Sequence, residues 1–207
     1  MRNVAIKVYQ FSELSDEAKN KIIERNRHTL VDHEWYYYII DGFKAEIAPA
    51  FGIDCSQVYF SGFGSQGDGA CFEGSFEYRK GMTQAVKRLE IYNSDGRNEL
   101  LEIAQEMAGL QKSNFYGLYG DLSHSHTRYV HELSVYVNVH RNGPGYSGDI
   151  DPVEGTDEAY EYCLRDLMQW LYRQLESEYF HLTSDQTIAE WLDEGEDEYT
   201  ANGELYL

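Results

Sequence analysis

The apolar residues of this chain follow two different periods, and segments of the two kinds alternate along the sequence. Helical spacing is found over residues 35–51 and again over residues 160–175. Between them, residues 58–78 and 129–139 show the alternation of apolar and polar side chains that is typical of strands. Hairpins interleaved with helices predict an α+β fold, in which an antiparallel sheet of about four to six strands carries helices packed mainly on one face.

Shorter signals predict the remaining elements of the N-terminal part. Ser15 is a typical helix N-cap, and the two acidic residues that follow it lie where the helix dipole favours negative charge. We therefore expect a helix from Ser15 to about His28, preceded by a short strand over residues 4–9.

Further helices are predicted in the middle and at the end of the chain. Helical spacing over residues 82–89 and 100–110 predicts two helices, separated by a polar turn at residues 93–96. Thr183 or Ser184 is expected to cap a short final helix.

Length and composition predict one folded domain. A chain of 207 residues is long enough to bury a sizeable core, and a hydrophobic content of 42% is too high for a disordered acidic protein. We therefore expect a single domain over residues 1–207, with a strongly acidic C-terminal segment over residues 150–207. Because no apolar run approaches the ~20 residues of a membrane span, and the N-terminus lacks the features of a signal peptide, we expect a cytoplasmic protein.

The cysteines do not suggest a disulfide framework or a thiolate metal site. Cys55, Cys71 and Cys163 are odd in number, widely spaced and in no C-x-x-C arrangement. We interpret them as small packing residues that are buried or half-buried.

The distribution of charge is more informative than the net charge of -19. Residues 1–100 carry a balance of -3, from 15 acidic and 12 basic side chains, whereas residues 101–207 carry a balance of -16, from 21 and 5. A nucleic acid or an anionic membrane would be repelled by most of this surface, so neither is expected as a direct partner. The complementary partner is a basic protein surface, such as that of a protein or complex that handles nucleic acid.

The candidate partner-binding residues lie in the acidic C-terminal segment. Carboxylates spaced along a surface imitate the phosphates of a nucleic acid, and an aromatic residue among them supplies an anchor. A solvated face and a polar tail would show the same composition, and this interpretation stays open. The residues that we select are Asp157, Glu158, Glu161, Glu190, Trp191, Asp193, Glu194, Glu196, Asp197 and Glu198.

A glycine-rich stretch over residues 61–69 is the second candidate site. Its glycines match G-x-G-x-x-G, but the sequence that follows alternates like a strand instead of opening a helix, which excludes the dinucleotide-binding mechanism. A kinase-type loop is excluded as well, because no H-R-D or D-F-G motif follows. The stretch is either a hairpin connection whose polar groups bond local amides or a binding loop. The exposed residues for a binding role are Ser61, Ser65, Gln66 and Asp68.

A group of histidines offers a weak metal-binding alternative. A hairpin would bring His124 and His126 near His131, and an H-x-H pair on one strand is a spacing that metal ligands use. No H-E-x-x-H or similar motif supports a metal, and a polar turn would contain the same residues. We therefore predict no metal, no cofactor and no enzymatic activity, and no catalytic residue is named.

Three blocks of the sequence form a recognisable pattern. The first reads F-S-G-F-x-S-Q-G-D-G-A-x-F within residues 59–72, and the other two are an opening block over residues 9–19 and a closing block over residues 170–185. With these blocks the chain resembles a family of phage and prophage proteins whose members are often labelled "antitoxin of toxin–antitoxin stability system". The resemblance implies an origin in a mobile element, and hence a place in the cytoplasm of the host cell. It supplies no catalytic residues.

Charge and resemblance together favour a non-enzymatic accessory protein of a phage or mobile element. Such a protein would bind and inhibit a host or rival protein, in the manner of anti-defence, anti-CRISPR or antitoxin proteins, by covering a basic nucleic-acid-binding surface. One alternative is a protein or enzyme that binds a small ligand or metal at the glycine-rich hairpin and the histidines. Another is a structural or assembly role in a virion.

Overall fold

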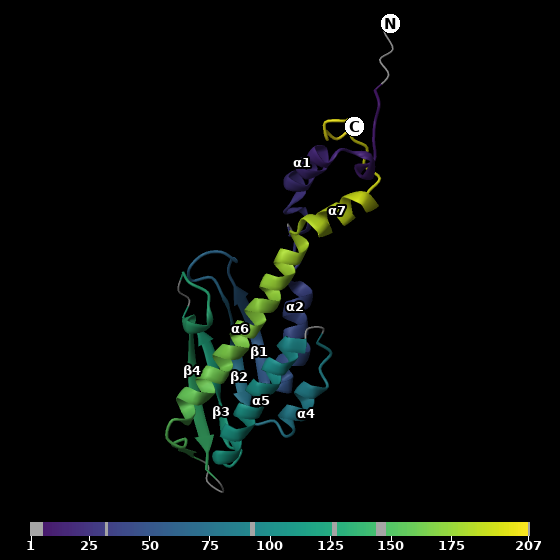
Figure 1. Cartoon of the computed structure of the whole chain (residues 1–207). Coiled ribbons are helices and arrows are strands. Elements are labelled where there is room, and N and C mark those ends of the chain that lie inside the picture. Colours follow the sequence, from purple (N-terminus) through teal and green to yellow (C-terminus); the bar gives the residue numbers. More distant parts are fainter. Residues whose placement is uncertain (1–5, 32, 92–93, 126–127, 144–147, 207) are drawn as a thin grey trace. The chain divides into compact units, whose positions relative to one another are not determined.

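The computed structural model describes residues 6–31, 33–91, 94–125, 128–143 and 148–206, and these form two compact units (Figure 1). Unit 1 combines Met1–Tyr36 with Ser177–Leu207, and unit 2 comprises Tyr37–Glu176. The prediction that residues 1–207 form one domain stays a prediction.

Unit 2 is an α+β structure around a five-stranded antiparallel sheet, as the sequence predicts. The strands follow one another in the order of the chain, so the sheet is a meander. The strand bounds are β1 (Ile53–Phe60), β2 (Ala70–Glu77), β3 (Leu118–His124), β4 (Val135–Asn142) and β5 (Asp149–Ile150). The alternating segments over residues 58–78 and 129–139 both contribute strands to antiparallel hairpins, β1 with β2 and β3 with β4, and β5 is a further short strand.

The helices of unit 2 cover one face of this sheet (Figure 1). They are α2 (Tyr37–Gly42), the π-helical turn η3 (Phe43–Ile47), α3 (Ala48–Ala50), α4 (Met82–Lys87), α5 (Ser94–Ser113) and the unit 2 part of α6 (Thr156–Leu182). The register explains which face they cover: Ile53, Phe76, Gly120 and Val139 lie in one row across the sheet. Phe76 stacks on Tyr160 of α6 with ring centroids 4.8 Å apart, so this apolar row meets the helices.

The opposite face of the sheet is polar, and none of the described helices of unit 2 lies on it (Figure 1). Its neighbouring row consists of Asp54, Ser75, Asp121 and Asn138, all of which are exposed. This separation of apolar and polar rows is the period-two pattern of the sequence, expressed as the two faces of one sheet.

The turn predicted at residues 93–96 is wrong in part, because α5 already begins at Ser94 and includes Gly96. Ser and Asp at positions 94 and 95 favour the first turn of a helix as much as they favour a turn. The indole Nε1 of Trp170 donates to the carbonyl oxygen of Gly96 at 3.0 Å.

Two predicted strands are also shorter than expected. The strand expected over 129–139 begins only at Val135, because Glu132–Ser134 form a 3-10 turn, η4, that His131 caps. Of the strand expected over 4–9, residues 4 and 5 lie outside the described residues, and Tyr9 forms only an isolated antiparallel bridge with Tyr199.

Unit 1 is a small helical structure made from both ends of the chain. It contains η1 (Phe11–Glu13), α1 (Asp16–Asn26), η2 (Thr29–Val31), the last residues of α6 and α7 (Asp185–Glu194). The Ser15 and Ser184 hydroxyls accept from the amides of Ala18 and Thr187 and cap α1 and α7, as predicted.

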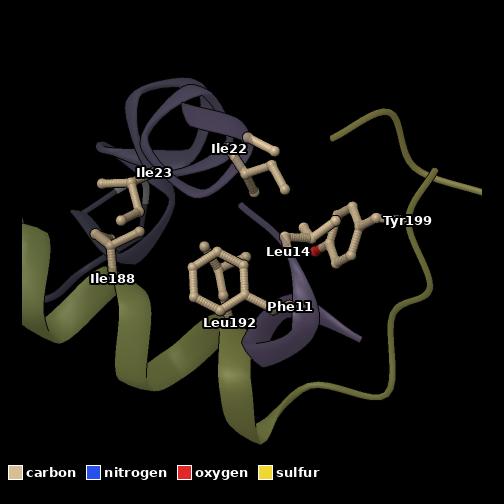
Figure 2. Close-up of a cluster of buried hydrophobic side chains, with 8 residues drawn as sticks. Phe11, Leu14, Ile22, Ile23, Ile188, Leu192 and Tyr199 are labelled. Carbon is tan, nitrogen blue, oxygen red and sulfur yellow. The ribbon is translucent and has the colours of Figure 1, made fainter. Parts of the chain in front are cut away.

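The core of unit 1 is one cluster of buried apolar side chains between α1 and α7 (Figure 2). Its members are Phe11, Leu14, Ala18, Ile22, Ile23, Ile188, Leu192 and Tyr199. The backbones of Tyr9 and Tyr199 add two hydrogen bonds of 2.8 Å. Residues far apart in the sequence thus hold unit 1 together.

Among the described residues, no helix combines the length and the apolar character that crossing a membrane requires.

Candidate functional site

The outward face of α7 carries the first part of the predicted acidic site. Ile188 and Leu192 point from α7 into the core of unit 1, one helical turn apart (Figure 2). Glu190, Asp193 and Glu194 fall on the other side of a helix with 3.6 residues per turn, and all three are exposed. The burial of two apolar residues therefore fixes the direction of three carboxylates.

The chain beyond α7 continues this surface. Glu196, Asp197 and Glu198 are exposed, and buried Tyr199 anchors the segment through its bridge to Tyr9. Trp191 is 38% exposed and lies among the carboxylates in sequence. We call residues 190–198 the acidic segment.

Few carboxylates of the acidic segment have a partner in the described part of the chain. Glu190 accepts a hydrogen bond of 2.9 Å from Gln186, and no salt bridge of the described residues involves any member of the segment. Lys21 and Arg25 of α1 pair with Glu204, and Arg27, which follows α1, pairs with Glu24 and Asp185. The remaining basic residue of α1, Lys19, lies 5.9 Å from the ring centroid of Phe11 and lines a groove with Glu190 and Asp193, with which it forms no salt bridge. These pairs hold the pKa of Glu24 and of Glu204 below its ordinary value, through hydrogen bonds from Arg27 and Lys21 respectively.

The end of α7 is electrostatically unfavourable. Asp193 and Glu194 lie in its last turn, which contains no basic residue, at the negative end of the helix dipole. Each such charge costs a helix about 0.3–1 kcal/mol. The acidic segment is therefore not explained by the stability of the helix that carries it.

The other three predicted residues belong to unit 2. Asp157 and Glu158 are exposed in the first turn of α6, where the helix dipole stabilises them. Glu161 accepts a hydrogen bond from Arg165 one turn later and is half-buried. The structure thus divides the ten predicted residues, seven in unit 1 and three in unit 2, and Glu161 is the one engaged in a salt bridge within the described chain.

The glycine-rich stretch, residues 61–69, is the connection between β1 and β2. The Asp68 carboxylate accepts from the amides of Gly64 and Ser65 at 3.0 and 2.7 Å, which holds the pKa of Asp68 below its ordinary value. Ser61 donates to the carbonyl of Val130 and accepts from the amide of Gly69, both at 3.2 Å. These two residues of the loop prediction are used to fold the loop itself.

Aromatic packing and a special backbone conformation complete this loop. Phe63 stacks on Tyr172 of α6 with centroids 5.5 Å apart, and the Tyr172 hydroxyl donates to the carbonyl of Gly62 at 2.9 Å. Gly67 has φ +96, which an L side chain rarely adopts. Ser65 and Gln66 are exposed at the tip, so they are the loop residues whose side chains face solvent.

The structure does not gather the predicted histidines into a metal site. His124 is buried and stacks on Tyr59 with centroids 4.9 Å apart, whereas His131 Nδ1 accepts from the amide of Leu133 at 3.0 Å. His126 lies outside the described residues. Within the residues that the structure describes, no group of three or more His, Cys, Asp or Glu side chains could hold a metal ion.

Glu73 joins these strands in a way that the sequence does not reveal. Its carboxylate accepts from the Tyr59 hydroxyl at 2.9 Å and from the His124 amide at 2.8 Å. The hydrogen bond to Glu73 raises the pKa of the Tyr59 hydroxyl. The sequence shows Glu73 only as a polar position of an alternating strand, so its role depends on a contact between β2 and β3 that local pattern does not contain.

The cysteines are buried packing residues, as predicted. Burial raises the pKa of the thiols of Cys55 and Cys71 to about 11 and that of Cys163 to about 12. Thiolates are scarce at neutral pH under these conditions, so none of the three is an activated nucleophile.

A cavity of about 960 Å³ lies at one end of the sheet in unit 2. Asp54, Glu77 and Tyr119 from the polar face line it, together with Tyr116. Tyr116 and the preceding Phe115 have φ values of 60 and 55 and are exposed. Sequence reasoning missed this cavity, because its walls come from the ends of four strands.

These observations define an α+β protein with a helix-covered antiparallel meander and an exposed acidic segment on a separate compact unit. The chain belongs to the family of domains of unknown function DUF8835, whose model matches residues 35–185. No curated protein matches the chain, and no solved structure does. The match contains all of unit 2, whereas the acidic segment lies outside it.

Proposed function

We propose that this protein is a non-enzymatic accessory protein of a phage or other mobile element that binds and inhibits a host or rival protein. It belongs to the anti-defence, anti-CRISPR or antitoxin type and covers a basic nucleic-acid-binding surface with its acidic C-terminal part. The observation that carries the proposal is the acidic segment, whose six carboxylates are exposed and form no salt bridge with the described residues. The resemblance of residues 59–72 to phage and prophage proteins supports the mobile-element origin.

Exposed carboxylates that form no salt bridge with the described residues are available to a cationic surface. A basic partner would be attracted over a distance of about 10 Å at 0.1 M salt, and this attraction accelerates association. Glu190, Asp193 and Glu194 project from one side of a short helix, so they present their charges on a folded support. Trp191 supplies an exposed aromatic ring of the kind that anchors protein interfaces.

The unfavourable position of these charges gives further support. Asp193 and Glu194 oppose the dipole of α7, and residues 177–207 contain nine acidic side chains without any Lys or Arg. Stability alone would favour basic residues at the end of this helix. A surface that recognises positive charge requires the acidic ones.

The test is a binding measurement with a charge-neutralised variant. The tagged protein is used to capture partners from a lysate of the host at 50 mM and 500 mM NaCl, and captured proteins are identified and then purified. The variant E190Q/D193N/E194Q/D197N removes four charges at nearly constant volume. We expect it to bind the purified partner at least about tenfold more weakly than the unchanged protein at 0.15 M salt.

A matched variant controls for net charge. D41N/E46Q/E102Q/E106Q also removes four negative charges, but from exposed positions of helices in unit 2. It should leave the affinity for the partner nearly unchanged. Double-stranded DNA should compete with the protein for the partner. Equal affinities of the two variants, or a partner that binds DNA and this protein simultaneously, would contradict the proposal.

A further inference from the structure

The strand β4 has a free edge along most of its length (Figure 1). It pairs with β3 from Val135 to Arg141, but with β5 only at Arg141 and Asn142. Pro152 follows shortly after β5 and lacks the amide that a longer strand would need. Among the described residues, no backbone group pairs with Val135–His140 on the side of β5.

The hydrogen bonds of β4 with β3 and the residues next to β3 show which backbone groups of β4 face the free edge. The amide of Asn142 donates to Gly117, and the carbonyl of Ser134 accepts from Ser125, both at 2.9 Å and both on the side of β3. In an antiparallel ladder the direction alternates from one residue to the next. The amides and carbonyls of Val135, Val137 and Val139 therefore point to the free edge.

Between Val135 and His140, this edge lacks the charged side chains and prolines by which proteins protect exposed strands. Residues 135–140 read V-Y-V-N-V-H and contain no Lys, Arg, Asp, Glu or Pro. Charged residues, prolines and bulges are the usual means of preventing a strand from pairing with another chain. In a chain with a net charge of -19, an uncharged strand at a sheet edge is a suitable place for association.

We propose that a second copy of this chain pairs with β4 along this edge, so that two β4 strands lie antiparallel about a two-fold axis at Val137. Residues that face one another across an antiparallel pair must lie on the same face of the sheet. With Val137 opposite its own copy, Val135 faces Val139, and Tyr136 faces Asn138 of the other chain. Every outward amide and carbonyl of the three valines then finds a partner.

A second copy fits this edge better than a charged partner does. In the symmetric register, paired side chains lie on the same face of the sheet and the outward amides and carbonyls of the two copies meet one another. Both conditions hold because the three outward residues are evenly spaced about Val137. A shift by two residues in one direction would place Val135 opposite Arg141, which β5 already occupies, and a shift in the other direction would place Val139 opposite Leu133, which lies in η4 and outside β4. No charge of residues 135–140 opposes a like charge across the axis.

Analytical ultracentrifugation of the full chain tests this proposal with two variants. V137P removes the central outward amide without touching the ladder to β3, and V137A removes the same side chain but keeps the amide. We expect the unchanged protein and V137A to sediment as dimers and V137P as a monomer, with a dissociation constant raised at least about tenfold. Circular dichroism establishes that V137P is folded.

A cross-linking experiment tests the register without a proline. In Y136C/N138C, position 136 of one copy lies opposite position 138 of the other in a non-hydrogen-bonded pair, with Cα atoms about 4.5 Å apart, as a disulfide requires. Mild oxidation should therefore give a covalent dimer that reduction reverses. A monomeric unchanged protein, a V137P variant that dimerises normally, or the absence of the cross-link would overturn the proposal.

The salt dependence of self-association distinguishes this inference from the proposed function. Like charges on two copies repel, so higher salt should strengthen self-association while it weakens binding to a basic partner. The variant E190Q/D193N/E194Q/D197N should still dimerise, and V137P should still bind the partner. Each proposal can thus fail without the other.

Discussion

Unit 1 and unit 2 differ in the density of their charged residues and in the kind of apolar core that they contain. Unit 2 has 140 residues with 21 acidic and 11 basic side chains, whereas unit 1 has 67 residues with 15 acidic and 6 basic ones. Unit 2 folds around a sheet, and unit 1 folds around one small cluster between α1 and α7. The denser negative charge thus lies on the unit with the smaller core.

The family match follows the same division. Residues 35–185 include all of unit 2 but only parts of unit 1, and they leave out the acidic segment. The sheet is therefore what this chain shares with the family model.

Substitutions in the two cores should show the largest difference between the units, because each should lower the free energy of unfolding of one unit. Phe72 is fully buried and its ring lies 5.3 Å from that of Phe43, so F72A should cost unit 2 about 3–5 kcal/mol of its free energy of unfolding. Leu192 is buried in unit 1, and L192A should cost that unit about 2–5 kcal/mol.

Amide hydrogen exchange measures these losses unit by unit. We expect L192A to reduce protection in α1 and α7 but to leave that of β2 and β3 unchanged, while Q186A on the outer side of α7 changes neither. Equal loss of protection in both units would show instead that residues 1–207 unfold as one cooperative domain.

High pH should destabilise unit 2 through Tyr160. Burial raises the pKa of this hydroxyl to about 12, from an ordinary value of 10. Because the folded state favours the protonated hydroxyl, its contribution is fully present below pH 10 and is lost as the pH rises through about 12. The loss amounts to about 2–3 kcal/mol.

Urea unfolding between pH 9 and pH 12 measures this contribution. Y160F removes the titrating group and keeps the ring that stacks on Phe76, so the pH dependence of its stability should be correspondingly smaller. The buried thiols titrate in the same range in both proteins, so the difference between the two curves isolates Tyr160. Parallel curves would contradict the assignment.

The smallest expected change in the free energy of unfolding comes from removing carboxylates at opposite ends of two helices. D193N/E194Q removes unfavourable charges from the last turn of α7 and should stabilise unit 1 by about 0.3–1 kcal/mol per charge. D157N/E158Q removes favourable charges from the first turn of α6 and should destabilise unit 2 by a similar amount. Urea unfolding at low ionic strength measures both, and shifts of the same sign would contradict the dipole argument.

Local pattern predicted much of the fold. The Ser15 and Ser184 caps, the helical period of α6 and the alternating strands of both hairpins are recorded in nearby residues, and the structure confirms them. The division into two units was not predicted, because it depends on contacts such as that between Tyr9 and Tyr199, whose positions in the sequence carry no common signal.

The candidate site was predictable to a smaller extent. Composition located the acidic segment, and the period of α7 explains why its carboxylates face outward. Composition could not show that Asp68 and Ser61 use their hydrogen-bonding groups within the loop, or that Glu73 links Tyr59 to His124. Such roles depend on which strands become neighbours.

The construction of unit 1 from two distant segments also sets an order of events during synthesis. The ribosome adds about 5–20 residues per second, so the 140 residues of unit 2 take roughly 7–30 s to make after residues 1–36 have been joined. During that time Phe11 and Ile22 have no Ile188 or Leu192 to pack against. The core of unit 1 can therefore form only after Ile188, Leu192 and Tyr199 have been made, when unit 2 has already had time to fold.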